Sequence, residues 1–262
     1  MKLAWITDPH LEFLKKQQTD DFLVQVKSTK ADFFLISGDI SVAKKLDQTL
    51  SLIEQHISPL FFVLGNHDFY GGNIADIREI ASQHDGYLPE AGIITLTKNT
   101  CLIGHDGWAD GRLGDYWNSP VMLADYKNIT NFMGLDKGAR FRELNRLGNE
   151  ATDFISEHLT KALGKFDHVV LVTHVPPFRD ACWHQGEISD ENYTPHFACE
   201  AMGDILTKIM GNMSDHHLTV LCGHTHSSGI FKPLKNITVF TGSADYGHPK
   251  IQDILDVDKI TT

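Results

Sequence analysis

Five short apolar runs, each ended by a cluster of polar residues, constrain the fold of this chain more than any other feature. The runs span residues 3–6, 33–36, 60–64, 169–172 and 218–222. They are rich in β-branched and aromatic residues and are bounded by turn residues, as is typical of buried strands. We therefore expect five strands, each with a polar cluster at its carboxyl end.

Segments with helical spacing lie between these runs. Apolar residues recur three or four positions apart in 46–57, 74–81, 144–163 and 198–210. The alternation of strand and helix predicts an α/β fold, in which ligand sites gather at the carboxyl ends of the strands. Two further pairs of short runs, 93–96 with 101–103 and 229–231 with 238–240, predict antiparallel strands.

The composition fits a folded domain in a reducing compartment. Of 262 residues, 42% are apolar and 22% are charged, which excludes a disordered chain, and we expect one domain over 1–262 with an insertion around 104–146. The net charge of −11 opposes binding to nucleic-acid backbones and anionic membranes. Four scattered cysteines and an N-terminal run too short for a signal sequence predict a cytoplasmic location.

The polar clusters are weak signals singly, but together they form a set of metal ligands. Carboxylate, amide and imidazole donors suit Mn, Fe or Zn, and thiolates are absent from these loops. A carboxylate that bridges two cations is common in two-metal hydrolytic sites. We therefore predict a binuclear metal site. Its donors come from Asp8, His10, Asp39, Asn66, His174, His224 and His226.

In chain order, the blocks D-x-H, G-D, G-N-H-D, H-x-P-P and G-H-T-H resemble those of the calcineurin-like metallophosphoesterases, and the resemblance extends from Asp8 to His226. It implies a four-layer α-β-β-α sandwich of two mixed sheets flanked by helices. It also implies two metal ions that share Asp39 as a bridge. One ion would be held by Asp8, His10, Asp39 and His226, and the other by Asp39, Asn66, His174 and His224.

The chemistry that follows is hydrolysis of a phosphate ester. Two cations make a metal-bridging hydroxide available near neutral pH, and it would attack phosphorus in line with the leaving oxygen. His67 is the candidate general acid for that oxygen. Asp68 is expected to hydrogen-bond His67, raise its pKa and fix its orientation. The alternative is a structural role for His67 in the ligand loop.

The segment 104–146 is the part least determined by the resemblance. It is either a lid that stacks a base and clamps phosphate, or a surface excursion whose aromatic residues pack onto the sheet. Its candidates are Trp108, Arg112, Tyr116, Trp117, Tyr126, Arg140 and Arg142. Arg179, His184, Tyr246 and His248 are further candidates near the site.

The predicted function is a metal-dependent phosphatase or phosphodiesterase that acts on a small phosphorylated molecule. Nucleic acid is disfavoured as a partner, and no membrane partner is expected. A nuclease is the enzymatic alternative, but the net charge disfavours it. A non-catalytic interaction scaffold with the same fold is the other alternative. The presence of His67 and of every predicted ligand disfavours a scaffold. The sequence leaves open the kind of ester, the native metals and the oligomeric state.

Overall fold

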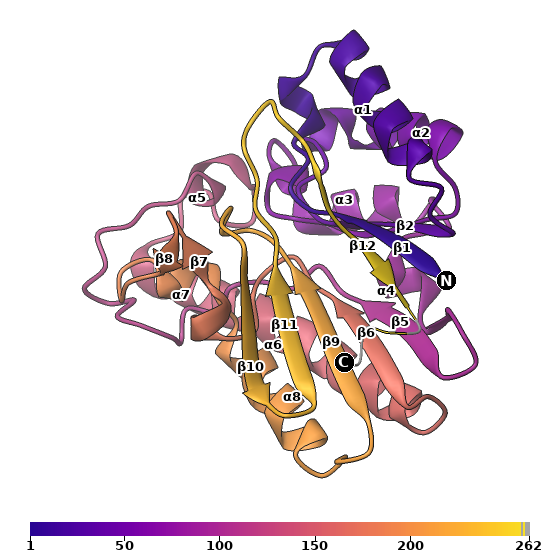
Figure 1. Ribbon diagram of the computed structural model, residues 1–262. Helices are drawn as coiled ribbons and strands as arrows, with labels where there is room; N and C mark the ends of the chain where they lie inside the picture. The colour runs from indigo at the N-terminus through magenta and orange to yellow at the C-terminus, as the bar shows by residue number, and fades with distance from the viewer. Residues whose placement is uncertain (258, 260–262) are drawn as a thin grey trace.

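Two mixed β-sheets pack face to face in this computed structural model, which describes residues 1–257 and 259. Helices cover the outer face of each sheet (Figure 1). The predicted four-layer α-β-β-α sandwich is confirmed. No helix in the described residues is long and apolar enough to cross a membrane.

The first sheet has the strand order β12-β1-β2-β3. Strands β1 (Lys2–Ile6), β2 (Phe33–Ser37) and β3 (Leu60–Val63) are parallel, and β12 (Ile251–Asp256) is antiparallel to β1. Helices α1 (Lys16–Ser28), α2 (Leu46–His56) and α3 (Ile74–Ala81) supply the apolar side chains that cover its outer face.

The second sheet has the order β10-β11-β9-β6-β5-β4. Its parallel strands are β5 (Thr100–Gly104), β6 (His168–Val172), β9 (His217–Cys222) and β11 (Ile237–Thr241). The antiparallel edges are β4 (Ile94–Thr95) and β10 (Gly229–Leu234), and the outer helices are α6 (Lys137–Leu163) and α8 (Glu200–Met210). The shorter elements are α4 (Leu88–Ala91), α5 (Asp125–Asn128), α7 (Thr194–Phe197), β7 (Trp183–His184) and β8 (Glu187–Ile188).

The continuous apolar runs are explained by burial on both faces of each sheet. Along β1, Leu3 and Trp5 point into the layer between the sheets, whereas Ala4 and Ile6 pack toward the helices. Successive residues of a strand point to opposite faces, so a strand covered on both sides has apolar residues at most of its positions. The same alternation repeats along β2 and β6.

All five predicted strands and all four predicted helical segments are present, and both predicted antiparallel pairs form. Helix α6 begins before the predicted spacing does, at Lys137, where the Asp136 side chain accepts a hydrogen bond from the Ala139 N–H at 2.7 Å. Helix α1 and strand β12 were not predicted from the sequence. Strand β12 has exposed as well as buried positions, and its place is set by pairing with β1 rather than by its own pattern.

Candidate metal centre

The carboxyl ends of five parallel strands bring all seven predicted ligands together. Asp8 and His10 follow β1, Asp39 follows β2, and Asn66 follows β3. From the second sheet, His174 follows β6, and His224 and His226 follow β9. Their side chains are buried except for His224 and His226, which are partly exposed.

Five of these seven residues have a left-handed backbone. The φ angles of Asp8, His10, Asp39, His224 and His226 lie between 44° and 70°. Non-glycine residues rarely adopt this conformation, and such strain concentrates at functional sites.

Glycines before the ligands make room for their side chains. A Cβ atom on Gly65 would collide with the Asp39 carboxylate, and one on Gly223 would collide with the Asp8 carboxylate. A Cβ on Gly38 would meet the His174 ring. The G-D, G-N-H-D and G-H-T-H blocks therefore need glycine because another loop's side chain lies against the backbone there.

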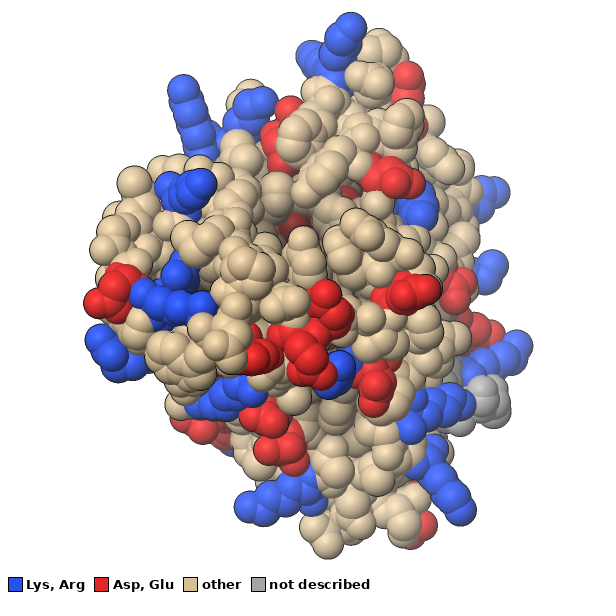
Figure 2. Space-filling model, turned by 90° about the vertical axis from the view of Figure 1, so that its left-hand side faces the viewer, with Lys and Arg blue, Asp and Glu red and all other residues tan. Residues whose placement is uncertain are grey.

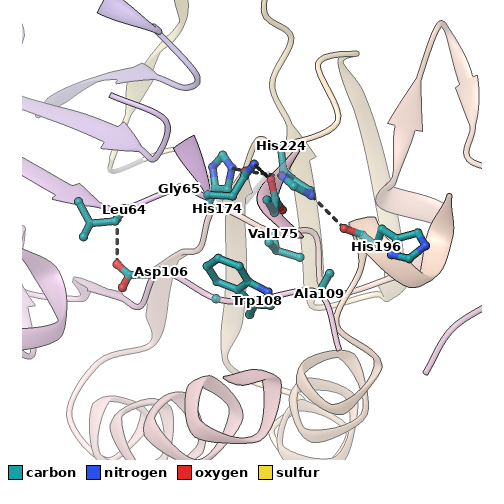
Figure 3. Close-up of a pocket in the computed structure, with 12 residues that line it drawn as sticks. Leu64, Gly65, Asp106, Trp108, Ala109, His174, Val175, His196 and His224 are labelled. Carbon is teal, nitrogen blue, oxygen red and sulfur yellow. Dashed lines mark hydrogen bonds between the residues drawn. The ribbon is translucent and has the colours of Figure 1, made fainter. Parts of the chain in front are cut away.

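Two groups of donor atoms meet at Asp39. In the first group, one donor atom each of Asp8, His10, Asp39 and His226 lie within 4.8 Å of one another. In the second group, the Asn66 Oδ1 lies 3.1 Å from His174 Nε2 and 2.9 Å from His224 Nδ1. Figure 3 shows the His174 and His224 rings next to each other. Asp39 places Oδ2 3.5 Å from His10 Nε2 and Oδ1 3.5 Å from His174 Nε2.

These donors fit two metal ions. His10 Nε2 and His226 Nε2 face each other at 3.3 Å, and two buried carboxylates share the same space. Buried carboxylates and facing imidazole nitrogens need a cation between them, and no lysine or arginine forms an ion pair with Asp8 or Asp39 among the described residues. The mixed oxygen and nitrogen set is one that Mn, Fe and Zn accept.

Outer hydrogen bonds orient the imidazole rings. His174 Nδ1 lies 2.9 Å from the Ser37 carbonyl oxygen, and His224 Nε2 lies 3.2 Å from the His196 carbonyl oxygen. Each of these nitrogens donates its N–H to a carbonyl, so the opposite ring nitrogen carries a lone pair toward the other donors. Metal-binding histidines are held by the same kind of partner.

The electrostatics favour ionised carboxylates and one neutral imidazole. Burial raises the pKa values of Asp8 and Asp39, but the surrounding histidines outweigh it and hold both below their usual range. Burial, aided by His174, lowers the pKa of His224 to about 4. An unprotonated His224 can donate its lone pair to a cation.

His67 lies beside the donors, but the structure corrects the expected role of Asp68. Both Asp68 oxygens accept backbone N–H groups, from Ile40 and Ser41 at one oxygen and from Gly65 at the other. Asp68 therefore ties the loops after β2 and β3 together, and the predicted hydrogen bond to His67 does not form.

The carboxylate beside His67 belongs to Glu12, and not to Asp68 as the sequence predicted. Its Oε1 lies 3.6 Å from His67 Nδ1 and 3.5 Å from His10 Nδ1, and its side chain is only 8% exposed. Burial lowers the pKa of His67, but the charges of Asp39 and Glu12 raise it to about 9. The sequence reading missed Glu12, although its position two residues after His10 was a usable signal.

Asp125 and Tyr70 orient Asn66, and the sequence reading missed both. The Asn66 Nδ2 donates to Asp125 Oδ1 at 2.8 Å, and the Tyr70 hydroxyl donates to the same oxygen at 2.6 Å. The amide oxygen of Asn66 is thereby directed to His174 and His224. Nothing in the spacing of the sequence connects residue 125 to residue 66.

The segment 104–146 mostly packs into the fold, as the second of its two predicted roles describes. Trp108, Tyr116 and Tyr126 are buried. Arg112 binds Asp110 and Asn149, Arg140 lies over the Tyr126 ring, Arg142 is exposed, and Trp117 is 57% exposed. Among the residues of this segment, Leu123, Ala124 and Asp125 line the cavity beside the donor atoms.

That cavity has a volume of about 300 Å³. The candidates His184 and Tyr246 line it, whereas Arg179 pairs with Glu191 and His248 is exposed. On the face that carries α5, α7 and β7, Figure 2 shows a hollow with an acidic side chain at its bottom. The full lining is Asp39, Asn66, His67, Tyr70, Leu123, Ala124, Asp125, His184, Phe197, His224, His226 and Tyr246.

Comparison with known proteins gives a match to one family over most of the chain. A family model described as calcineurin-like phosphoesterase matches residues 1–228. No curated protein matches the sequence significantly.

Two solved structures share the fold. A dimetal phosphatase from Danio rerio is 13% identical, with a TM-score of 0.59 over 95% of this chain and 89% of that chain. GAP50, described as the anchor in the inner membrane complex of Plasmodium, is 14% identical, with a TM-score of 0.53 over 97% of this chain and 76% of that chain. At these identities the similarity concerns the fold alone.

Proposed function

Because the chain belongs to the calcineurin-like phosphoesterase family, and is therefore a metal-dependent phosphoester hydrolase, we propose that it acts on a small phosphorylated molecule as a phosphatase or phosphodiesterase. The observation that carries the proposal is the position of Asp39, whose two carboxylate oxygens face two separate donor groups at 3.5 Å. A bridging carboxylate is the feature that a two-metal hydrolytic site requires.

In this proposal, Asp39 is shared by two metal ions of the Mn, Fe or Zn type. Asp8, His10 and His226 complete one set of ligands, and Asn66, His174 and His224 complete the other. When bound, such ions lower the pKa of a coordinated water and withdraw charge from the phosphoryl oxygens. Asp125 and Tyr70 would keep the Asn66 oxygen directed inward by holding its NH2 group.

His67 is proposed to supply the proton that the leaving oxygen needs. In hydrolysis, the oxygen of water forms a bond to phosphorus, the bond from phosphorus to the organic oxygen breaks, and that oxygen takes a proton. With Nδ1 of His67 held by Glu12, Nε2 is the nitrogen left to donate. Glu12 is a positioning residue in this account, because it contacts both His67 and His10.

The proposal includes a cytoplasmic location, which the four unpaired, buried cysteines support. It disfavours nucleic acid as the substrate because the net charge is −11. It also prefers an enzyme to a scaffold because all seven donors and His67 are present. The Plasmodium anchor protein shows that the fold itself does not decide between these two roles.

A metal-reconstitution assay tests the proposal. Metal-free protein would be loaded with Mn²⁺, Zn²⁺ or Fe²⁺ and assayed with 4-nitrophenyl phosphate and bis(4-nitrophenyl) phosphate. We expect turnover of at least one ester by the wild type, and a loss of at least about 10³-fold in Asp39→Asn. The exposed Asp204→Asn is the matched control. Wild-type turnover by Asp39→Asn would contradict the assignment.

A further inference from the structure

The residues that line the 300 Å³ cavity beyond the donor atoms indicate which kind of organic group the substrate carries. Donor residues and His67 form one part of the lining. The remainder comes from Tyr70, Leu123, Ala124, Asp125, His184, Phe197 and Tyr246. This remainder is where the organic group of a phosphoester would lie.

No lysine or arginine of the described residues lines this cavity. Of the arginines that the sequence suggested as phosphate contacts, Arg112 pairs with Asp110 and Arg179 with Glu191. Arg140 lies over the Tyr126 ring, and Arg142 does not line the cavity. Among the described residues, the walls outside the donor residues and His67 carry one carboxylate, that of Asp125, which is 5% exposed. Away from the metal ligands and His67, a second phosphate on the substrate would therefore find no lysine or arginine and one carboxylate neighbour.

Aromatic rings flank the opening instead. The Tyr246 ring, 51% exposed, lies 4.9 Å from the ring of Phe13, which is 56% exposed. From a different part of the chain, Phe197 lies 5.5 Å from Tyr193 and 5.3 Å from the His184 ring. In Figure 2 the rim of the hollow consists mainly of residues other than Lys, Arg, Asp and Glu. Large exposed aromatic side chains gathered at a cavity mark a binding surface.

We propose that this cavity selects a phosphoester with a single phosphate and an uncharged, aromatic or otherwise apolar organic group. The group lies between the Tyr246 and Phe197 sides, and the donor end of the cavity takes the phosphate. Substrates with a second phosphate or another fixed negative charge on the organic group bind more weakly. This inference rests on the proposed function, because it takes the phosphate to lie at the metal ligands.

Binding of non-hydrolysable phosphonates to the metal-loaded protein, measured by calorimetry, tests the inference. We expect benzylphosphonate to bind about tenfold more tightly than methylphosphonate, because the ring is buried. A carboxylate on that ring, as in 4-carboxybenzylphosphonate, should cancel the gain. Equal affinity for the benzyl and methyl compounds, or a preference for the carboxylated one, would overturn the inference.

Substitutions in the cavity walls test whether the walls determine this selectivity. Phe197→Ala and Tyr246→Ala should each weaken benzylphosphonate about three- to tenfold without changing methylphosphonate. Leu123→Lys should strengthen 4-carboxybenzylphosphonate. Trp117→Ala removes an exposed ring outside the cavity and should change nothing. A uniform effect of the wall variants on all three ligands would contradict the assignment of the walls.

Turnover of 4-nitrophenyl phosphate in the same preparations separates the two proposals. Turnover without the expected phosphonate selectivity overturns the substrate class alone. Selectivity without turnover under any of the three metals overturns the proposed hydrolysis and supports the cavity's preference for an uncharged group.

Discussion

Two strand ends of this molecule carry the same residue types and use them differently. After β1 come Asp8 and His10, and after β5 come His105 and Asp106, all four of them buried. The Asp106 carboxylate accepts three hydrogen bonds of 2.8 Å, from the Leu64 N–H, the Arg78 Nε and the Tyr87 hydroxyl. Asp8 accepts the Thr7 hydroxyl at 2.6 Å and the His224 N–H at 3.1 Å, and its Oδ1 also faces the His226 imidazole at 3.5 Å.

The difference lies in the charge beside the carboxylate, because Asp106 pairs with Arg78, whereas the Thr7 and His224 groups that donate to Asp8 are neutral. Asp106 is saturated by protein donors that include an arginine, so it holds β3, α3 and the end of β5 together without any ligand. At the end of β1, carboxylate oxygens and imidazole nitrogens instead lie close together. A buried carboxylate among other metal-type donors needs a cation from outside the chain, and this distinguishes a binding site from a structural network.

On the metal side of this comparison, His67→Ala should lower the rate without removing the metal ions. We expect metal content and stability to be retained, while turnover of alkyl phosphates falls about 10²- to 10⁴-fold, because their leaving oxygen needs a proton. Activated 4-nitrophenyl esters should lose much less. Steady-state kinetics with both kinds of ester measure the split, and an equal loss for both would contradict the acid role.

On the structural side, Asp106→Asn should lower stability instead. Removing one charge of the buried pair with Arg78 should reduce the free energy of unfolding by about 3 kcal/mol, with or without metal. Asp39→Asn is the counterpart, and it should cost the metal-free protein less, because Asp39 has no arginine partner and only the nearby imidazoles and the His67 N–H favour its charge. Chemical denaturation of the metal-free proteins gives both values. The comparison fails if Asp39→Asn is the more destabilised variant.

The neighbouring His105 predicts a pH dependence on the structural side. Burial lowers its pKa to about 4, and its Nδ1 accepts the Gly107 N–H at 3.1 Å. Since the unfolded chain binds this proton near pH 6.5, the contribution of His105 is complete above that pH and is lost as the pH falls toward 4. From pH 7 to pH 4.5, wild-type stability should fall by about 2 kcal/mol more than that of His105→Asn, which keeps an acceptor.

Denaturation curves of the two proteins at both pH values provide the measurement. The difference between the two proteins isolates His105 from other buried histidines, which titrate in both. Parallel loss of stability in wild type and variant would show that His105 does not titrate in this window.

Glu12→Gln should give the smallest effect, about a tenfold loss of turnover on alkyl phosphates. The variant removes the charge between His10 and His67 but keeps the shape of the side chain. Glu54→Gln is a matched control, because Glu54 pairs with His84 at 3.0 Å outside the donor groups. Kinetics with alkyl and 4-nitrophenyl esters show whether the loss follows the leaving group. A loss equal for both esters, or shared by Glu54→Gln, would contradict the positioning role.

The strands and the convergence of the ligands were predictable because both follow from residues that are close together in the sequence. An apolar run fixes a buried strand, and the residues after it must lie at its carboxyl end. The partners of those residues were less predictable. Asp68 is adjacent to His67 in the sequence, yet three backbone N–H groups compete for its carboxylate. Asp125 reaches Asn66 only through tertiary packing, which no local pattern encodes.

The roles of the arginines and aromatic residues in 104–146 could not be predicted from neighbouring residues in the sequence either. Arg112 and Arg140 could have faced a phosphate or another part of the chain, and their partners Asp110 and Tyr126 are fixed by packing. His105 and Asp106 are the same residue types as the ligand pair Asp8 and His10. Only their hydrogen bonds to other protein groups show that they are structural.

The most direct test of the binuclear centre is the number of metal ions held per chain. After reconstitution and removal of excess metal, elemental analysis by plasma mass spectrometry should find two ions in the wild type and in Asp204→Asn, and at most one in Asp39→Asn. Two ions in Asp39→Asn, or fewer than two in the wild type at saturating metal, would contradict the claim that Asp39 joins two metal sites.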